Sequence, residues 1–323
     1  MRVLFLGGTR FVGAHAARAV VRAGHTVAVA HSGRHEGSLP ATVLHLHGPR
    51  QHLVRQSGEV DDFVPDVIVD TFSAGGDERT TADKAANLLA CAERNRSRRV
   101  VAISSCDVYQ AAKDAGVDGY PANQMSNARF PVTEDSSLRD PHPEGTRGGH
   151  DNILMERALA GSPVVTILRL GMVYGPAPES WREGFLVQKV KDHDHDLEIP
   201  AGAAQLCPRV AVGRVAGAIL AALEAPTDGW WACNVVDPYS WTYVGLAQEI
   251  ASVLGWHWNL REVARSDSLH PFNLWAPLLL SDERLRLTLA VSEPDPAEAL
   301  AETVIWLRDN HFELPERLRR SAT

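Results

Sequence analysis

The fold is decided close to the start of the chain, by Val3-Leu4-Phe5-Leu6-Gly7-Gly8-Thr9-Arg10-Phe11-Val12-Gly13. The short apolar run predicts a buried strand, and a glycine-rich turn follows it at once. Apolar residues then recur at helical spacing as far as Gly24. A strand, a tight glycine turn and a helix in this order are the context in which a dinucleotide-binding fingerprint is credible.

Two glycines of this stretch, Gly7 and Gly13, have separate roles in such a fingerprint. Gly7 lets the chain turn tightly, and Gly13 lets the helix pack close to the strand. The N–H groups at the start of the helix would face a pyrophosphate. Arg10 stands where the middle glycine is expected, and its guanidinium would fold over the phosphate as a charged donor. We therefore predict these cofactor contacts, with an ordinary turn that binds no ligand as the alternative: Gly7, Thr9, Arg10, Phe11, Val12 and Gly13.

Length and composition describe an ordinary globular protein. The 323 residues suffice for a full core and two lobes. The net charge of −8 argues against a nucleic-acid groove, and no apolar stretch is long enough to span a membrane. Glycines and Arg10 interrupt the first apolar run too early for a signal peptide. The four cysteines have no paired spacing, so we expect reduced thiols in a cytoplasmic protein.

Strands alternate with helices along the first half of the chain. Apolar runs predict strands at 24–31, 42–47, 65–72 and 99–104, and a helix is expected over 78–95. This alternation predicts an α/β fold with a Rossmann-type, doubly wound parallel sheet. Ligands of such sheets lie at the carboxyl ends of the strands, which adds three expected cofactor contacts: Phe72, Ser73 and Ser104.

The end of the second strand bears on the choice of cofactor. An Asp or Glu at this place usually holds the ribose hydroxyls of NAD. The sequence here is His31-Ser32-Gly33-Arg34, with no carboxylate before Glu36. Because a hydroxyl and a guanidinium suit a 2′-phosphate, we predict that Ser32 and Arg34 favour NADP slightly over NAD.

Two patterns imitate metal sites. His45 and His47 would share one face of the third strand, but no third ligand lies near them in sequence. The run Asp192-His193-Asp194-His195-Asp196 is typical of a solvated loop at a helix end. We predict no metal at either place.

A resemblance becomes specific at residues 101–109, Val-Ala-Ile-Ser-Ser-Cys-Asp-Val-Tyr. This segment resembles the strand-five motif of extended short-chain dehydrogenases/reductases, the NAD-dependent epimerase/dehydratase family. Four further segments resemble that family in the same order, and together they cover nearly the whole chain: 168–176, 208–212, 233–243 and 280–306. The resemblance implies a dinucleotide-binding domain and a smaller C-terminal substrate lobe.

The resemblance also implies which residues would do the chemistry. Ser105 stands where the family serine orients the substrate, and Asp107 lies beside it. The family's Tyr-x-x-x-Lys pair falls on Gly148 and Asn152, so both catalytic residues are missing. Without them a general acid/base contribution on the order of 10²–10⁴ in rate is lost. The candidate catalytic residues are therefore Ser105, His150, Asn152 and Tyr109, with Tyr109 alternatively a part of the pocket wall.

The remaining chain divides into a loop and a second lobe. Residues 110–149 are rich in Gly, Pro, Asn and Asp and predict a long loop over the site. We place the dinucleotide domain at 1–176 and the substrate lobe at 177–323, with strand 230–236 and helix 241–254 as candidates to return to the first domain. Substrate contacts implied by the resemblance are Asp107, Met172, Tyr174 and Arg209.

Three functions stay open at this point. The first is an NAD(P)-dependent oxidoreductase or epimerase with an atypical active site, acting on a small molecule. The second is a redox-neutral catalyst of the same fold, and the third is a non-catalytic dinucleotide-binding regulator. RNA binding, suggested by chloroplast stem-loop-binding relatives with a similar turn, is disfavoured by the acidic balance. The resemblance further implies a homodimer formed through the helices near 78–95 and 150–160.

Overall fold

The computed structural model describes residues 1–55, 58–71, 78–117, 127–142, 151–200, 206–225, 230–264, 276–291 and 295–319. At its centre lies a seven-stranded parallel sheet of order β10-β6-β5-β4-β1-β2-β3. Its strands are β1 (Arg2–Leu6), β2 (Thr26–His31), β3 (Leu44–His47), β4 (Val67–Asp70), β5 (Arg99–Ser105), β6 (Val165–Leu170) and β10 (Trp231–Val235). The predicted doubly wound α/β architecture is confirmed.

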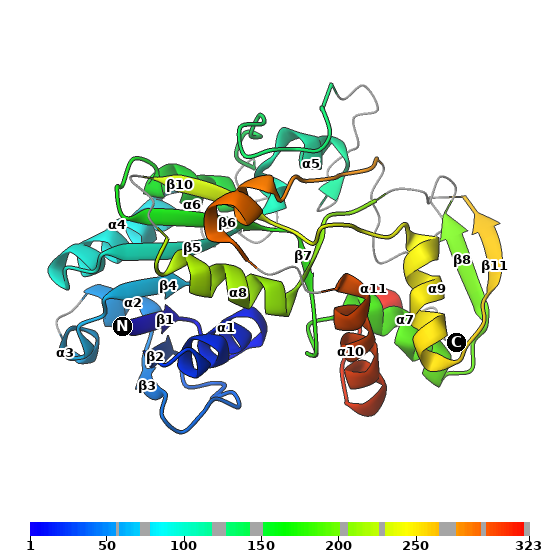
Figure 1. Cartoon of the computed structure of the whole chain (residues 1–323), viewed down its shortest axis with the longest axis horizontal. Helices are drawn as coiled ribbons and strands as arrows, with labels where there is room; N and C mark the ends of the chain where they lie inside the picture. The colour runs from blue at the N-terminus through cyan, green and yellow to red at the C-terminus, as the bar shows by residue number, and fades with distance from the viewer. Residues whose placement is uncertain are drawn as a thin grey trace.

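Helices cover both faces of the sheet, as Figure 1 shows. One face carries α1 (Phe11–Arg22) and α8 (Val212–Ala222), and the other carries α2 (Arg50–Arg55), α3 (Glu59–Phe63), α4 (Glu78–Arg94) and α6 (Asn152–Leu159). Alternate side chains of each strand serve the two faces. In β1, Val3 and Phe5 pack toward α1 and α8, whereas Leu4 and Leu6 pack toward α4. Burial on both faces explains why these strands are continuous apolar runs.

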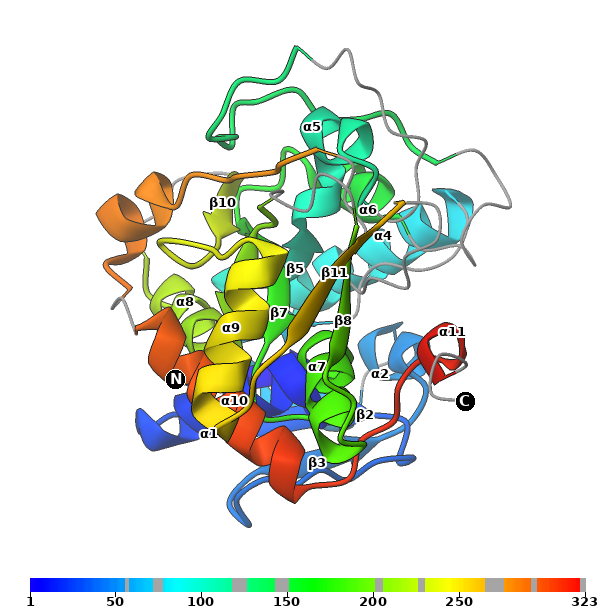
Figure 2. The ribbon, with the colours of Figure 1, turned by 90° about the vertical axis from the view of Figure 1, so that its right-hand side faces the viewer.

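A second lobe stands beyond the carboxyl end of the sheet (Figures 1 and 2). It contains two small parallel pairs, in which β7 (Met172–Tyr174) joins β9 (Arg209–Ala211) and β8 (Asp196–Pro200) joins β11 (Asn259–Val263). Its helices are α7 (Trp181–Lys191), α9 (Tyr243–Leu254), α10 (Pro296–Asp309) and α11 (Glu316–Arg319). Of the two segments considered as candidates to return, β10 pairs with β6 in the central sheet, whereas α9 packs against α7 and α10 in the second lobe.

Between the two parts, residues after β5 form a 3₁₀ turn (Cys106–Val108) and a short helix, α5 (Gln110–Asp114). Within the described part of the predicted loop, Val132 forms a β-bridge to Leu280 and Tyr109 forms one to Leu138. A π-helical turn (Leu285–Leu289) packs against α8. Among the helices of the described ranges, none has the length and apolar character needed to cross a membrane.

Candidate functional site

The glycine-rich turn has the geometry that a phosphate-binding turn requires. Gly7 has a φ of +87°, in the left-handed region that favours glycine, and its N–H donates to the carbonyl of Ala30 at 3.0 Å. A Cβ at Gly13 would lie 2.3 Å from the carbonyl oxygen of Gly7, so only glycine lets α1 approach the turn this closely. The first N–H groups of α1 have no acceptor within the helix and point out of its N-terminus.

A cavity of about 710 Å³ adjoins this turn, and its wall includes Thr9, Arg10 and Phe11. The guanidinium of Arg10 is directed to Glu179, with Nε 3.0 Å and Nη2 2.8 Å from the carboxylate oxygen Oε1. Glu179 belongs to the segment 176–179 that forms the opposite wall. Arg10 therefore holds the two walls together, rather than folding over the turn as the sequence predicted. Val12, also expected at the cofactor, is half-buried and packs against the core between the sheet and helices α1 and α8.

The connection after β2 carries the residues expected to select the cofactor. Ser32 and Arg34 are both exposed. Glu36 is the first carboxylate after β2. Its Oε2 lies 3.0 Å from Nδ1 of His45, and its Oε1 lies 3.0 Å from Nε2 of His47. This carboxylate is therefore occupied by imidazoles. Phe72, Ser73 and His150, the other predicted site residues of the first domain, lie outside the described residues.

The two serines at the end of β5 point to different faces. Ser105 is half-buried, and its Oγ accepts the N–H of Asp107 at 3.2 Å, which caps the 3₁₀ turn. Ser104 is buried, and its Oγ donates to Glu156 of α6 at 2.6 Å. Opposite directions follow from the alternation of side chains along a strand. Ser105 thus lies at the end of β5, where the resemblance places the family serine. Ser104, a predicted cofactor contact, is instead hydrogen-bonded to Glu156 in the interior.

Asn152 takes part in a buried polar network instead of standing free at the site. Its Nδ2 donates to Asp107 Oδ1 at 3.0 Å. Arg139, 1% exposed, donates to the carbonyl and carboxylate of Asp107 and to Asp151 at 2.8 Å. Asp151 caps α6 through the N–H of Ile153. Asp107, predicted at the substrate site, is thereby bound to Arg139 in the protein interior, and Asn152, predicted at the catalytic site, is bound to Asp107.

Tyr109 lies fully buried between the sheet and the second lobe. Its hydroxyl donates to Asn234 Oδ1 at 2.6 Å and accepts from Arg169 Nη1 at 2.9 Å. Burial raises the pKa of this phenol well above its ordinary value, although Arg169 acts in the opposite direction. A phenol held neutral and bonded on both sides does not suit proton transfer near neutral pH. The predicted catalytic role does not fit this position, and the alternative of a wall residue fits it better.

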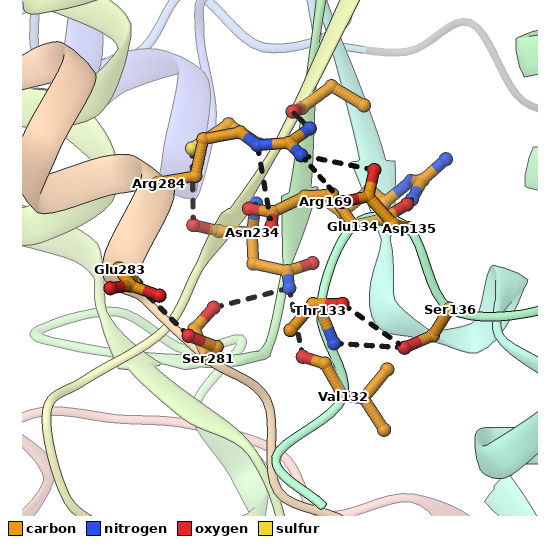
Figure 3. Close-up of polar contacts among 12 residues, drawn as sticks. Val132, Thr133, Glu134, Asp135, Ser136, Arg169, Asn234, Ser281, Glu283 and Arg284 are labelled. Atoms are coloured by element: carbon orange, nitrogen blue, oxygen red, sulfur yellow. Dashed lines mark hydrogen bonds and ion pairs between the residues drawn. The ribbon is translucent and has the colours of Figure 1, made fainter. Parts of the chain in front are cut away.

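Beneath Tyr109, a chain of buried charges joins distant parts of the sequence. Arg169 of β6 donates through Nη2 to Glu156 at 2.7 Å, and both side chains are almost fully buried. Figure 3 shows Asn234 of β10 reaching the carbonyls of Val132 and Ser281. Glu134 accepts the N–H of Asn234 at 2.8 Å and pairs with Arg284. Sequence reasoning missed this chain, because its members come from segments far apart in the sequence, such as Glu134 and Arg284, which are joined only in the folded chain.

The residues predicted at the substrate lie between the sheet and the second lobe. Arg209 is buried, donates to Glu183 at 2.6 Å and lies 4.4 Å above the ring of Tyr174. Tyr174 donates to Asp237 at 2.8 Å, and burial raises the pKa of both groups. Met172 is half-buried in the same β7–β9 pair. Arg209, which the resemblance places at a substrate phosphate, is engaged with Glu183 and with the ring of Tyr174.

Two further cavities lie near these elements. One of about 520 Å³ is lined by polar residues of α5 and of the segment 127–137, among them Gln110, Asp114 and Asp135. The other, of about 370 Å³, lies between α1, the start of α8 and α10. The first belongs to the segment predicted to cover the site, so it is the better candidate for a polar substrate.

No protein-family model matches the chain, and no curated protein matches it either. Solved structures do match over almost the whole length. A UDP-glucose 4-epimerase from Stenotrophomonas maltophila, solved with NAD and formylated UDP-arabinopyranose, is 17% identical with a TM-score of 0.72, covering 96% of this chain and 98% of its own. A dTDP-glucose 4,6-dehydratase from Bacillus anthracis, solved with NAD, is 16% identical with a TM-score of 0.70, covering 96% and 97%.

A UDP-glucose 4-epimerase from Thermotoga maritima, solved with UDP-glucose, is likewise 16% identical with a TM-score of 0.69, covering 96% of this chain and 99% of its own. These solved structures are members of the NAD-dependent epimerase/dehydratase family. The chain therefore has the fold of that family, which is the fold expected from the resemblance.

Proposed function

We propose that this protein binds a nicotinamide dinucleotide on the Gly7–Gly13 turn and acts on a small molecule in the manner of epimerases and dehydratases. The carrying observation is the close contact of Gly13 with the Gly7 carbonyl, which places the start of α1 against the turn. The likeness to solved structures that contain NAD supports the same cofactor. Sugar nucleotides are the proposed substrate class, because the similar epimerases are solved with them.

Calorimetric titration with NAD(H) and NADP(H) tests the cofactor, with Thr9→Glu and Thr9→Gln as a matched pair. A carboxylate beside the N-terminus of α1 suits the helix dipole, so the fold is retained, but it repels a pyrophosphate. We expect micromolar binding by the wild type, a loss of at least about tenfold in Thr9→Glu, and a much smaller change in Thr9→Gln. Equal affinities in all three proteins would place the ligand elsewhere, and no binding by the wild type would end the proposal.

We further propose a preference for NADP. The support is an exposed guanidinium and hydroxyl on the connection after β2, together with the engagement of Glu36 by imidazoles. Arg34→Ala should weaken NADP binding by about tenfold and leave NAD binding unchanged, since only NADP carries the 2′-phosphate. The same loss for both dinucleotides would contradict the preference.

Ser105 is the proposed catalytic group that polarises a substrate oxygen, with His150 or another residue of 110–149 handling the proton. Its support is its place at the carboxyl end of β5, half-buried and without a charged partner in the described network. A screen for hydride exchange with sugar nucleotides and simple carbonyls tests this role. Turnover that is lost in Ser105→Ala supports it.

A second candidate, a redox-neutral catalyst or non-catalytic dinucleotide sensor, is favoured by a different observation. Asn152 and Tyr109 are both held in buried networks, so neither replaces the missing Tyr and Lys. Tight dinucleotide binding without hydride exchange on the whole panel would favour this candidate over the oxidoreductase.

We also propose a homodimer that uses α4 and α6, and a cytoplasmic setting. The two helices pack side by side on one face of the sheet, so their outer surfaces form one continuous area. All four cysteines are buried free thiols, as suits a reducing compartment. Light scattering on the wild type and on Ala86→Arg, a change at an exposed position of α4, tests the dimer. A monomeric mass for the wild type would refute it.

A further inference from the structure

Three histidines meet on one face at the edge of the central sheet. β2 and β3 are parallel, and their register places His31 opposite His47 and Val29 opposite His45. Because side chains two residues apart share a face, His45 and His47 lie on the same side as His31. The three imidazoles are in contact, with ring centroids 4.7–6.1 Å apart.

The connection between β2 and β3 brings a carboxylate to these rings. Gly33 and Gly37 have positive φ values of 78° and 69°, which let the connection fold back across the strand ends. A Cβ at Gly37 would lie 2.5 Å from the carbonyl oxygen of Thr9, so the connection packs directly on the glycine-rich turn. Arg18 of α1 donates to the carbonyl of Ser38 at 2.9 Å and fixes it further. Glu36 is thereby held against the histidines.

The ligand atoms of the four side chains lie close enough together to share one metal ion. Nε2 of His31 lies 2.9 Å from Nδ1 of His45, and that Nδ1 lies 3.0 Å from Oε2 of Glu36. Nε2 of His47 lies 3.0 Å from Oε1 of Glu36, and all four ligand atoms fall within 4.8 Å of one another. A tetrahedral ion with bonds of about 2.0–2.1 Å separates its ligands by about 3.3 Å.

The heavy-atom distances in this cluster bring ring nitrogens and carboxylate oxygens together without enough donors to serve them when the imidazoles are neutral. Gly33 N–H donates to Nδ1 of His31 at 3.2 Å, so a neutral His31 carries its proton on Nε2 and donates to His45. Nδ1 of His45 and Oε2 of Glu36 are then two acceptors facing each other at 3.0 Å. A metal cation between these atoms would accept a lone pair from each of the four side chains, including the two facing acceptors of His45 and Glu36.

We propose that His31, Glu36, His45 and His47 form a binding site for a divalent first-row transition metal, with Zn²⁺ as the first candidate. Imidazole nitrogens with one carboxylate are a ligand set that zinc accepts, and three such ligands on two strands and one on the connection would pin the edge of the sheet. The site is accessible, because Glu36 and His47 are more than half exposed while His31 is buried beneath them.

Metal binding would have two local consequences. Coordination through Nε2 of His31 moves the ring proton to Nδ1, so the Gly33 amide must release its hydrogen bond. Glu36 also lines the 710 Å³ cavity beside Thr9 and Arg10, so the ion would fix one part of that wall. The site itself does not depend on the proposed dinucleotide function.

Titration of the chelator-stripped full-length protein with ZnCl₂ alone tests the proposal, followed by Co²⁺ for its visible spectrum. Glu36→Gln and His47→Gln remove one ligand each at exposed positions, so both variants should fold. His52→Gln changes another exposed histidine and is the matched control. We expect one ion per chain, an affinity at least about tenfold lower in both ligand variants, and an unchanged affinity in the control.

Two further readouts complete the experiment. Co²⁺ should give the intense visible absorption of a tetrahedral site, and Zn²⁺ should raise the thermal unfolding midpoint of the wild type but not of His47→Gln. Absence of a bound ion would overturn the proposal. It would equally be overturned if Glu36→Gln and His47→Gln bound Zn²⁺ as tightly as the wild type and His52→Gln, since the ion would then sit on other surface groups.

Discussion

At position 152 an amide stands where the resemblance places a lysine, and the surroundings explain how it is accommodated. Asp107 accepts from Asn152 and is already paired with Arg139, which also holds Asp151. Asp107 and Asp151 both pair with the single guanidinium of Arg139, and Asn152 adds one neutral donor to Asp107. A neutral amide completes the hydrogen bonds without a further buried charge.

The pair of Glu156 and Arg169 should be the most costly to break among the charges described at the site. Glu156→Gln leaves a buried guanidinium without its anion and replaces one of the two carboxylate oxygens, which accept from Ser104 and Arg169, by an amide donor. We expect the free energy of unfolding to fall by about 3–5 kcal/mol in a urea titration. Glu179→Gln, which removes the exposed pair with Arg10, should cost less than about 1 kcal/mol. Equal losses in the two variants would contradict this account.

Asp151 should make stability depend on pH in the acid range. Burial acts to raise its pKa, but hydrogen bonds from Arg139 and from the amides of His142 and Ile153 lower it overall. Because the folded pKa lies below the unfolded value of about 3.9, the stabilisation is complete above that value and is lost as the pH falls through the folded pKa. The difference in unfolding free energy between the wild type and Asp151→Asn should therefore shrink below about pH 3.9. A constant difference from neutral pH down to about pH 3 would show that this carboxylate is not the cause.

At the scale of elements, α1 and the turn before it form one unit with β1. The apolar strand is buried on both faces, the turn needs the positive φ of Gly7, and the helix needs Gly13 to approach the turn. Other elements follow from simple patterns as well. α4 begins at Glu78 as predicted and ends at Arg94, one residue before the expected 95.

Gly13→Ala tests whether stability depends on the close approach of α1 to the glycine turn, because alanine would otherwise favour the helix. The new methyl group would meet the backbone of Gly7 and Gly8, so we expect a loss of about 1–3 kcal/mol of unfolding free energy and weaker dinucleotide binding. Gly213→Ala in the first turn of α8 meets no atom within 4 Å and should stabilise by up to about 1 kcal/mol. Thermal unfolding and calorimetry on both variants measure the two effects. A stabilising Gly13→Ala would mean that α1 does not need the contact.

At the scale of the whole molecule, polar contacts join the sheet to segments that are distant in the sequence. Asn234 of β10 contacts Tyr109, Val132 and Ser281 of the segments between the two parts. Asp237, which follows β10, receives the N–H of Ala211 and the hydroxyl of Tyr174 from the second lobe. A ligand at the carboxyl end of the sheet would lie between these parts.

Dinucleotide binding should therefore stabilise the whole chain. At a ligand concentration about 100 times the Kd, mass action adds about 2.7 kcal/mol to the folded state. We expect a higher thermal unfolding midpoint with the preferred dinucleotide for the wild type and little change for Thr9→Glu at the same concentration. An equal shift in both proteins would show that the stabilisation does not come from the turn.

The sheet, the glycine turn and the place of Ser105 at the end of β5 could all be predicted from the residues alone. Runs such as 3–6 and 100–103 are apolar throughout because both faces of a parallel strand are covered, and periodicity records this directly. The turn could also be predicted, because glycine is favoured at both of its key positions. Gly7 has a positive φ, and a Cβ at Gly13 would collide with the backbone of Gly7.

The partners of the polar side chains, in contrast, could not be predicted from sequence and became visible in the folded chain. His31 and Glu36 meet His45 and His47 because two strands pair in register and the connection between them folds back, and neither event leaves a short-range pattern. Arg10 contacts Glu179, and Tyr109 contacts Asn234, although each pair is separated by more than 120 residues in the sequence. Hydrogen bonds and ion pairs act over a few ångströms in space, so their partners depend on how the chain is brought together and not on spacing along it.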